Sequence, residues 1–424
     1  MSSSEKNAVI TPAWVDEKFV KEALSEAEGK QIAEVSCVRV EPAVKPGANF
    51  MSSLLRLSCE VRLAGGGAAE ARSLVLKVGL GAGPMADLAE EAQVFEREAR
   101  VYQELLPRAE EALRAVEGGG GGEWRPLAPR TLGAATGGDG RPAWLLLEDL
   151  RASGFRTQPP GAGLDRAHCS LGLRALARLH AASARLLEDS PPLRTDALFL
   201  RSPLTSREAC DQLASIVPRH ALALSAALAA SGRGGLADRY EAAAERIVGR
   251  LRQLDGSGPP ALQVLLHGDV WKNNFLFRYS GQQPTDVRLL DFQMVNIGAP
   301  TIDVVHFLYA NASEETHRQH LEQLVSEYHG TLQATLKALG LHQQADAYPL
   351  QELRRDMDRC APIALHCAIL MGVILGVEAH GVDIQQSYSS EDKQAEILTK
   401  VYSNPTYLSC IEYLSPHFQK QGVL

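Results

Sequence analysis

The sequence lacks the features that mark a nucleic-acid-binding or a disulfide-stapled protein. Its 43 lysine and arginine residues are outnumbered by 51 aspartate and glutamate residues, and the formal net charge of -8 argues against a nucleic-acid-binding surface. The seven cysteines are odd in number, widely spread and free of C-x-x-C pairs. We therefore expect reduced thiols, mostly in the core, and no disulfide framework. No internal repeat or heptad array is present.

The chain also has little that would target it to a membrane. The one membrane-like stretch, residues 361–377, is shorter than a usual span and contains Pro362 and His366, so we expect a buried helix there and no membrane span. The first residues are polar and do not follow the basic, apolar, small order of a signal peptide, which makes cytoplasmic residence the default. A chain of 424 residues with 45% hydrophobic and 22% charged residues suits one large two-lobed enzyme or a protein of two to three domains.

The first 150 residues are rich in strand patterns. Residues 55–63 alternate cleanly between apolar and polar side chains, which predicts a half-buried strand. Further strands are expected at residues 35–41, 73–79, 131–135 and 143–148. After residue 150 the sequence becomes polar and rich in glycine and proline, so we place a domain boundary there, with lobes at 1–150 and 151–424.

Two charged residues of the first lobe stand in apolar surroundings. Lys77 lies inside the apolar strand 73–79, where a charge needs a partner or a route to solvent. Residues 87–106 have helical periodicity, and Glu98 falls on an apolar shoulder of that helix, whereas Glu96 should face solvent. A strand lysine paired with an inward helix glutamate is the arrangement that positions nucleotide phosphates in kinases. A snorkelling Lys77 beside a rim Glu98 is the plainer alternative.

The loop between the first two strands, residues 46–53, is built from small residues. Such a loop can present backbone N–H groups to phosphate oxygens, although, taken without its neighbours, an ordinary hairpin connection is the plainer reading. Asn49 and Ser52 are the candidate phosphate-contacting residues of this loop, with Ser53 beside them.

The second lobe is helical apart from residues 264–292, which hold the main candidate site. Helical segments are expected at residues 171–187, 221–254, 315–339 and 350–377. Inside residues 264–292, short aromatic and β-branched runs at 275–279 and 287–291 flank a turn-rich segment and predict a hairpin. In that hairpin Asn274 and Asp291 become lateral neighbours, and their amide and carboxylate oxygens suit one Mg²⁺ ion.

The order of residues in this stretch matches the pattern of phosphoryl-transfer sites. Asp269 follows His267 and Gly268, Asn274 comes five residues later, and Asp291 closes the segment. Protein kinases use an aspartate base followed by an asparagine and an aspartate for magnesium in the same order. The plainer reading is that Asp269 and Asn274 form turns and that Asp291 caps a strand.

Together these segments resemble the ecdysteroid kinase-like family, within the group of aminoglycoside and choline phosphotransferases that share the protein kinase fold. The matching pieces are Phe95-x-x-Glu98-x-x-x-Tyr102, Leu147-Glu148-Asp149-Leu150, Leu179-His180-Ala181-Ala182-Ser183, His267-Gly268-Asp269-Val270-Trp271-Lys272-Asn273-Asn274, and Asp291-Phe292-Gln293. The implied fold is α+β and two-lobed, with an N-terminal antiparallel sheet plus one helix and a mostly helical C-terminal lobe that carries a catalytic hairpin.

The resemblance also implies a role for each matching residue. Asp269 would accept or orient the proton of an acceptor hydroxyl, and Asn274 and Asp291 would hold Mg²⁺. ATP would be bound by Lys77 with Glu98, and by the backbone of the hinge at residues 147–150, which includes Glu148 and Leu150. His267 and Asp303 would support the catalytic loop. Lys272 could meet the γ-phosphate or be solvated, and His180 is expected to be an ordinary packed or surface residue.

The segment after Asp291 limits the class of acceptor. Asp303 follows Asp291 by only twelve positions and no A-P-E sequence comes after it, so there is no room for a peptide-docking activation segment. A small alcohol is therefore the expected acceptor, and the family points to an ecdysteroid or a related lipophilic alcohol. A kinase for a cationic acceptor such as choline or an amino sugar, and a non-catalytic binding protein on the same fold, remain alternatives. The apolar residues of 363–375 could line an acceptor cleft or simply pack in the core.

Overall fold

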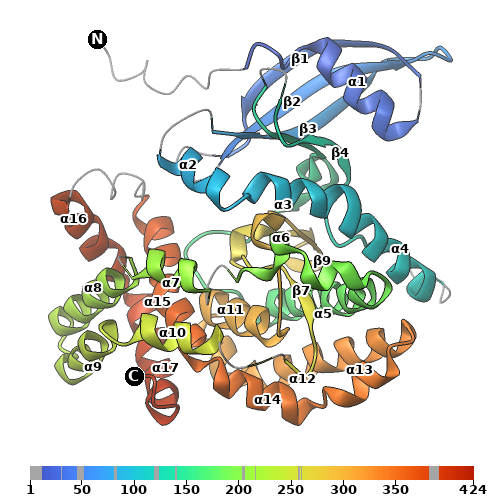
Figure 1. The fold of residues 1–424 in the computed structure, drawn as a ribbon. Helices are drawn as coiled ribbons and strands as arrows, with labels where there is room; N and C mark the ends of the chain where they lie inside the picture. Colours follow the sequence, from blue (N-terminus) through green and yellow to red (C-terminus); the bar gives the residue numbers. More distant parts are fainter. Residues whose placement is uncertain are drawn as a thin grey trace, which may run out of the picture. The chain divides into compact units, whose positions relative to one another are not determined.

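The computed structural model of the chain describes residues 12–29, 31–44, 52–80, 84–118, 124–138, 141–202, 206–214, 216–255, 258, 260–381 and 391–424. The chain divides into two compact units (Figure 1). Unit 1 comprises residues 1–106 and 128–155, and unit 2 comprises residues 107–127 and 156–424. Each unit is described by itself below.

Unit 1 is built on one antiparallel sheet. Its strands are β1 (Ile32–Pro42), β2 (Ser52–Leu63), β3 (Glu70–Gly79), β4 (Thr131–Ala135) and β5 (Trp144–Glu148), in the order β1-β2-β3-β5-β4. Every neighbouring pair is antiparallel. These five strands confirm the five strand segments predicted from the sequence. The alternation predicted for residues 55–63 is also confirmed, because Leu55, Leu57, Cys59 and Val61 are all buried.

One face of this sheet packs against a helix that was not predicted from the sequence. Helix α1 (Glu17–Glu28) begins at Asp16, whose side chain accepts a hydrogen bond from the Phe19 amide, and ends at Gly29, which has a left-handed φ of 59°. Its buried stripe, together with apolar residues of β1, β2, β3 and β4, forms a single hydrophobic core. Burial of this stripe, and not helix propensity alone, stabilises so short a helix.

The long helix predicted for residues 87–106 is divided into several pieces. Helices α2 (Pro84–Glu91) and α3 (Val94–Arg100) are separated at Gln93, which has a left-handed φ of 52° that ends the first helix. A π-helical turn follows at Val101–Leu105, and α4 (Leu106–Glu117) continues from it. The buried side chains that the periodicity predicted correctly are Val94, Glu98, Ala99, Val101, Tyr102, Leu105 and Leu106. Ala92 and Phe95 are only partly buried, and the pattern does not predict the break or the π-helical turn.

Unit 2 is mostly helical and has two small sheets. The strands are β6 (Phe155–Arg156), β7 (Val264–Leu266), β8 (Phe275–Ser280), β9 (Gln283–Leu289) and β10 (Asn296–Gly298), arranged as β6-β8-β9 and β10-β7. The helices are α5 (Arg166–Asp189), α6 (Ala197–Leu200), α7 (Arg207–Leu213), α8 (Val217–Ala230), α9 (Gly234–Ala244), α10 (Ile247–Asp255), α11 (Thr301–Asn311), α12 (Glu314–Ala338), α13 (His342–Ala347), α14 (Leu350–Arg359), α15 (Ala361–His380), α16 (Glu391–Tyr402) and α17 (Pro405–Lys420). The predicted α+β class, with an N-terminal antiparallel sheet and a mostly helical C-terminal part, is confirmed.

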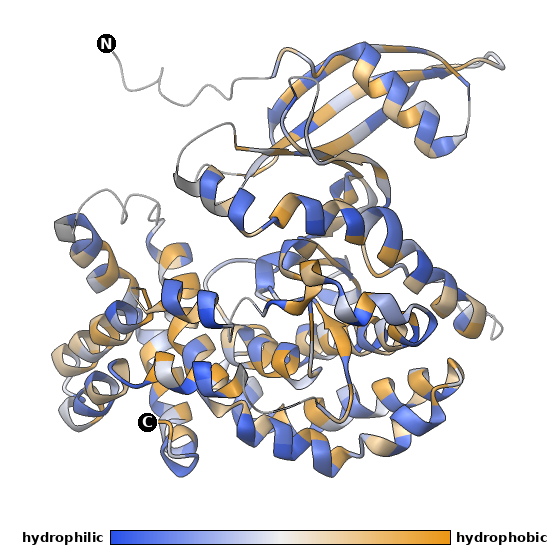
Figure 2. Cartoon of the chain, viewed as in Figure 1, coloured by the Kyte–Doolittle hydropathy of each residue, from blue (hydrophilic) through white to orange (hydrophobic). Residues whose placement is uncertain are grey.

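Helix α15 is the membrane-like stretch of the sequence. Its length and apolar composition would allow it to cross a membrane, but 72% of its most apolar window is buried inside the protein. Figure 2 shows the hydrophobic colouring that it shares with α11, the helix against which it packs. The segment 350–377 forms two helices instead of one, because Pro362 has no backbone N–H and sits in the first turn of α15.

Candidate active site

The catalytic loop predicted at His267 to Asn274 leaves the end of β7. Gly268 has a left-handed φ of 79°, and a Cβ atom on it would lie 2.2 Å from the carbonyl oxygen of Met294. Only glycine fits this turn without moving the backbone of the neighbouring segment. The turn that presents Asp269 therefore explains why glycine stands between His267 and Asp269.

The buried Asp303 of α11 anchors this turn by hydrogen bonds to its backbone. Its Oδ2 accepts hydrogen bonds from the His267 amide at 2.6 Å and from Nε2 of His180 at 3.0 Å, and its Oδ1 accepts one from the Gly268 amide at 3.0 Å. Burial alone would raise the pKa of Asp303, but the hydrogen bond and charge of His180, with the contribution of His267, hold that pKa below its usual value. A charged carboxylate therefore fixes two consecutive amides of the loop.

The ring of His267 is fixed between two segments of the site. Its Nε2 donates to the carbonyl oxygen of Leu290 at 2.9 Å, so its Nδ1 is the acceptor for the amide of Asp269 at 3.3 Å. Burial lowers the pKa of His267, which keeps the ring neutral in this tautomer. His267 thus links the turn before Asp269 to the segment that carries Asp291.

Asn274 lies directly against the predicted catalytic base. Its Nδ2 donates to the backbone carbonyl of Asp269 at 2.8 Å and to Oδ2 of the same residue at 3.0 Å. Asn274 is buried and ends the short 3₁₀ turn Lys272–Asn274, whereas Asp269 is half-buried. The structure therefore brings together Asp269 and Asn274, with His267 and Asp303 behind them.

The hairpin is present, but its register differs from the predicted one. Strand β9 ends at Leu289, which pairs with Phe275, and the amide of Leu290 donates to the carbonyl of Asn274 at 2.9 Å. Leu290 and not Asp291 is thus the residue opposite Asn274. Asp291 follows with a left-handed φ of 66°, a conformation that is strained for a residue with a Cβ atom. The prediction assumed a strand that continues to Asp291, whereas the backbone turns there.

The two predicted metal ligands have the chemistry that Mg²⁺ requires. Because the amide nitrogen of Asn274 is engaged with Asp269, the planar side chain directs its oxygen to the other side, where it can act as a hard ligand. A carboxylate oxygen of Asp291 would be the second ligand. Within the described part of the chain, no cluster of three or more His, Cys, Asp and Glu side chains is arranged for a metal ion. A pair of ligands suits Mg²⁺, which is commonly bound by few protein groups and by substrate phosphates.

Three supporting residues of this loop were not identified as such from the sequence. His180 of α5 is buried between Asp303 and the hydroxyl of Tyr328, which is 2.8 Å from its Nδ1. Asn311 accepts a hydrogen bond from the Lys272 amide at 2.6 Å and donates to the Val270 carbonyl at 2.8 Å. The third supporting residue is Glu378, whose carboxylate pairs with the buried ammonium group of Lys272. The alternative of a solvated Lys272 is therefore wrong. The Leu-His-Ala-Ala-Ser match was a usable signal for His180, whereas nothing nearby in sequence indicates Asn311 or Glu378.

Unit 1 contains the predicted lysine–glutamate pair. The ammonium group of Lys77 on β3 lies 2.7 Å from the carboxylate of Glu98 on α3, and both side chains are at most 5% exposed. The ring of Phe95 lies 5.9 Å from the same ammonium group. Glu96 is exposed, as the periodicity predicts. This contact excludes the alternative of a snorkelling Lys77.

The other candidate nucleotide-binding residues of unit 1 are Glu148, Leu150, Ser52 and Asn49. Glu148 ends β5 and accepts a hydrogen bond from the Arg130 amide at 2.8 Å, while Leu150 begins a 3₁₀ turn that is capped by Asp149. Asp149 also accepts hydrogen bonds from Arg56 and Ser73, each at 2.7 Å, which hold its pKa low against the effect of burial. Ser52 is buried at the start of β2, and Asn49 lies outside the described residues.

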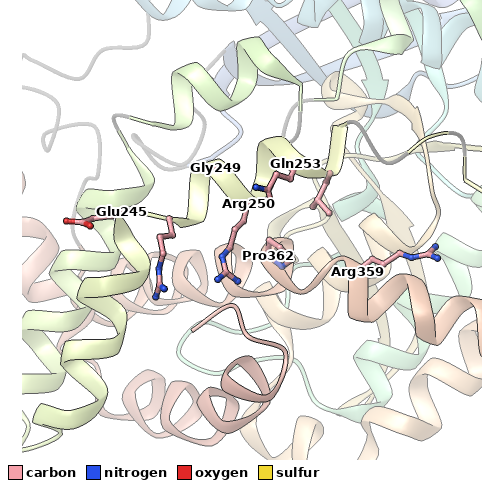
Figure 3. A pocket seen from close by; sticks show the side chains of 8 residues that line it. Glu245, Gly249, Arg250, Gln253, Arg359 and Pro362 are labelled. Carbon is pink, nitrogen blue, oxygen red and sulfur yellow. The ribbon is translucent and has the colours of Figure 1, made fainter.

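A surface pocket in unit 2 lies apart from these residues. It is formed by α10 with the ends of α14 and α15 (Figure 3), and its lining residues are Glu245, Arg246, Gly249, Arg250, Gln253, Leu254, Arg359 and Pro362. Arg359 is already paired with Asp356 at 2.8 Å. None of the motif residues lines this pocket, so it adds nothing to the candidate active site.

The chain matches one family model over most of its length. The model describes the ecdysteroid kinase-like family and matches residues 46–341, which contain every motif residue discussed above. No protein with a curated description matches the chain.

Several solved structures are similar to the chain at low sequence identity. A protein provisionally assigned as an aminoglycoside phosphotransferase, from Ralstonia eutropha, is 14% identical, with 93% of this chain and 98% of that chain covered and a TM-score of 0.40. A microcompartment-associated aminopropanol kinase is 13% identical, with coverage of 96% and 99% and a TM-score of 0.40. An aminoglycoside phosphotransferase from Streptomyces rimosus, in complex with ADP and streptomycin, is 16% identical, with coverage of 77% and 97% and a TM-score of 0.34.

Proposed function

Because the chain belongs to the ecdysteroid kinase-like family and is thus a small-molecule kinase, we propose that it transfers the γ-phosphoryl group of ATP to a hydroxyl group of a lipophilic alcohol. The observation that carries this proposal is the Asp269–Asn274 contact on a loop anchored by Asp303. This contact keeps the carboxylate of Asp269, the proposed base, next to the amide of Asn274, the proposed metal ligand.

In this proposal Asp269 accepts or orients the proton of the acceptor hydroxyl. The hydrogen bond from Asn274 orients its carboxylate, and the neutral His267 keeps the backbone around it in place. Asn274 and Asp291 would hold Mg²⁺, which would neutralise negative charge on the phosphates when bound. His267 and Asp303 act through the loop and touch no substrate.

Unit 1 would supply the nucleotide-binding groups. The buried ammonium of Lys77, oriented by Glu98, would bind the α- and β-phosphates of ATP. The backbone of Glu148 and Leu150 would bind adenine, and residues 46–53, with Asn49 and Ser52, would lie along the phosphates. The seven cysteines are all free thiols, which is compatible with the cytoplasmic residence that we propose.

The short segment after Asp291 supports a small-molecule acceptor. Residues 292–298 form a 3₁₀ turn and the short strand β10, and α11 begins at Thr301. No residues are left there for a long segment that could dock a peptide, as protein kinases require.

Helix α15 supports a lipophilic acceptor. Ile363, Leu365, Ile369, Met371 and Leu375 are buried, so they pack in the core as the plainer reading held. Four further apolar residues are only partly buried and recur at helical spacing, which puts them on one face; they are Leu370, Val373, Ile374 and Val377. The next residue along, Glu378, reaches the catalytic loop at Lys272. We propose this face as the apolar wall of the acceptor site.

The same contact disfavours a cationic acceptor. The carboxylate of Glu378 is neutralised by the ammonium of Lys272 at 2.6 Å. A positively charged amine near this point of the loop would have to compete with Lys272 for it.

An acceptor screen tests the proposal. The protein is incubated with Mg²⁺, γ-labelled ATP and panels of hydroxylated steroids, other lipophilic alcohols, choline and amino sugars, with the Asp269→Asn variant as the control. We expect transfer to lipophilic alcohols by the native protein only. Transfer to choline or amino sugars alone would favour the cationic alternative, and Mg·ATP binding without transfer to any acceptor would favour a non-catalytic binding protein.

A further inference from the structure

Lys272 has an environment that is unusual for a lysine within a loop. Its side chain is 3% exposed, and Nζ donates to Oε2 of Glu378 at 2.6 Å and to the carbonyl oxygen of Ala162 at 3.2 Å. A buried ammonium group requires such compensation, because removing it from water is costly. The ion pair joins the loop to α15 across 106 positions of the sequence.

Glu378 is equally unusual for its place in a helix. It lies in the last turn of α15, where the helix dipole disfavours a negative charge. Its Oε2 accepts a second hydrogen bond, from the amide of Gly161 at 3.0 Å. The carboxylate therefore ties together three segments of unit 2: the loop before α5, the catalytic loop and the end of α15.

We propose that Lys272 and Glu378 form a positioning pair that sets the geometry of the catalytic base, an inference that rests on the proposed function. Lys272 begins the 3₁₀ turn that ends at Asn274, and Asn274 in turn donates to Asp269. With its amide held by Asn311 and its ammonium held by Glu378, Lys272 leaves this turn little freedom to rotate. The pair also connects helix α15, which carries the proposed apolar wall, to the loop that carries Asp269.

A direct role of Lys272 at the γ-phosphate predicts a different outcome. In that case replacing Lys272 would weaken nucleotide binding, and replacing Glu378 would leave it unchanged or improve it by releasing the lysine. A positioning pair predicts that both replacements act alike, on turnover and not on nucleotide affinity.

The first experiment compares Glu378→Gln and Lys272→Met with the matched control Glu412→Gln. Glu412 of α17 accepts from Arg233 at 2.7 Å and lies outside the contacts described above. We expect kcat to fall by about 10²-fold in the first two variants, since misplaced groups cost about that much, with KM for ATP within about twofold of native. The double variant Lys272→Met/Glu378→Gln should be no slower than either single variant, because the pair acts as one unit.

The second experiment reports on position without any acceptor. Hydrogen exchange followed by mass spectrometry should show faster exchange of the amides of residues 267–275 in Glu378→Gln, with α12 unchanged, and Glu378→Asp should show a smaller change. Native turnover and native loop exchange in Glu378→Gln would overturn the proposal, as would a rise in KM for ATP confined to Lys272→Met. Uniformly faster exchange in Glu378→Gln and in Glu378→Asp would show a general structural role and overturn it too. Failure of the proposed function itself is distinct, because the native protein would then transfer phosphate to no acceptor.

Discussion

Two lysine–glutamate pairs, one in each unit, have almost the same ammonium–carboxylate distance and differ in how the surrounding structure supports them. The ammonium–carboxylate distance is 2.7 Å for Lys77–Glu98 and 2.6 Å for Lys272–Glu378. The first pair joins strand β3 to helix α3, which is close to it in sequence, whereas the second joins two segments 106 positions apart. Regular secondary structure places Lys77, but Lys272 lies in a loop that is also held by Asn311. Strand and helix backbone thus position the first pair, whereas the loop of the second pair is held by side-chain contacts from two helices.

The largest effect is expected at the loop itself, from Asp269→Asn. The amide keeps the shape of the side chain but cannot accept a proton, so kcat should fall by about 10²- to 10⁴-fold. Nucleotide affinity, measured by calorimetry with Mg·ADP, should stay native, because in our proposal unit 1 binds the phosphates. Native turnover would show that Asp269 is not the base. It would also contradict the assignment of nucleotide binding to unit 1 and catalysis to unit 2.

The two units should also differ in their response to acid, because all twelve histidines lie in unit 2. Burial lowers the pKa of His220, His306 and His317 to about 4. Below the ordinary pKa of about 6.5, the unfolded chain binds protons that these folded rings do not. The free energy of unfolding of unit 2 should therefore fall as the pH drops from 6.5 toward 4, by on the order of 2 kcal/mol per ring at pH 5.

Tryptophan fluorescence can follow this acid response. Urea unfolding at pH 7 and pH 5 would be compared in variants that keep only Trp14 and Trp144 of unit 1, or only Trp124 and Trp271 of unit 2. Replacing the buried His317 by asparagine should reduce the pH dependence, and replacing the exposed His342 should not. An unfolding midpoint for unit 2 that is the same at both pH values would contradict the prediction.

The pair of unit 1 is expected to give a smaller effect on catalysis. Glu98→Gln removes the charge that orients Lys77, so kcat/KM for ATP should fall about tenfold, a loss of about 1.4 kcal/mol of transition-state stabilisation. Glu70→Gln is the control, because Glu70 pairs with Arg72 at 2.8 Å on an exposed part of the same strand. If both variants behaved alike, the Lys77–Glu98 pair would be a structural ion pair only.

The smallest effect is expected at the proposed apolar wall. Ile374→Ala should raise KM for a lipophilic acceptor about fivefold, since a half-buried aliphatic side chain contributes about 1 kcal/mol, and should leave KM for ATP unchanged. Leu222→Ala, at an exposed leucine of α8, is the control. An unchanged KM for the acceptor would place the wall elsewhere and leave Glu378 as a support of the loop alone.

The parts of the molecule that the sequence predicts are those with local periodicity. Alternation in residues 55–63 and the helical shoulder at Glu98 each depend on neighbours a few positions away, and the structure confirms both. The hairpin was predicted correctly, but its register was not, because the left-handed backbone at Asp291 leaves no mark on hydrophobic periodicity. The helix break at Gln93 was missed for the same reason, whereas Pro362 was a usable sequence signal for the break at Cys360.

Hydrophobic periodicity did not predict the supporting residues of the loop, and only His180 had a motif match as a signal. His180, Asn311 and Glu378 each lie on a helix, and their hydrogen-bond partners on other elements are distant in sequence. Asp303 was identified only through the family resemblance. Contacts of this kind are set by how helices pack, which a single sequence does not encode locally.

The π-helical turn at Val101–Leu105 has a consequence for how this chain could change during evolution. Such a turn accommodates one residue more than an α-helix of the same length. Deleting one residue there would convert the turn into regular α-helix and would leave the helical phase of the residues that follow nearly unchanged. A single-codon deletion in this turn should therefore be better tolerated than one in the regular part of α4, which would rotate the residues that follow by about 100°.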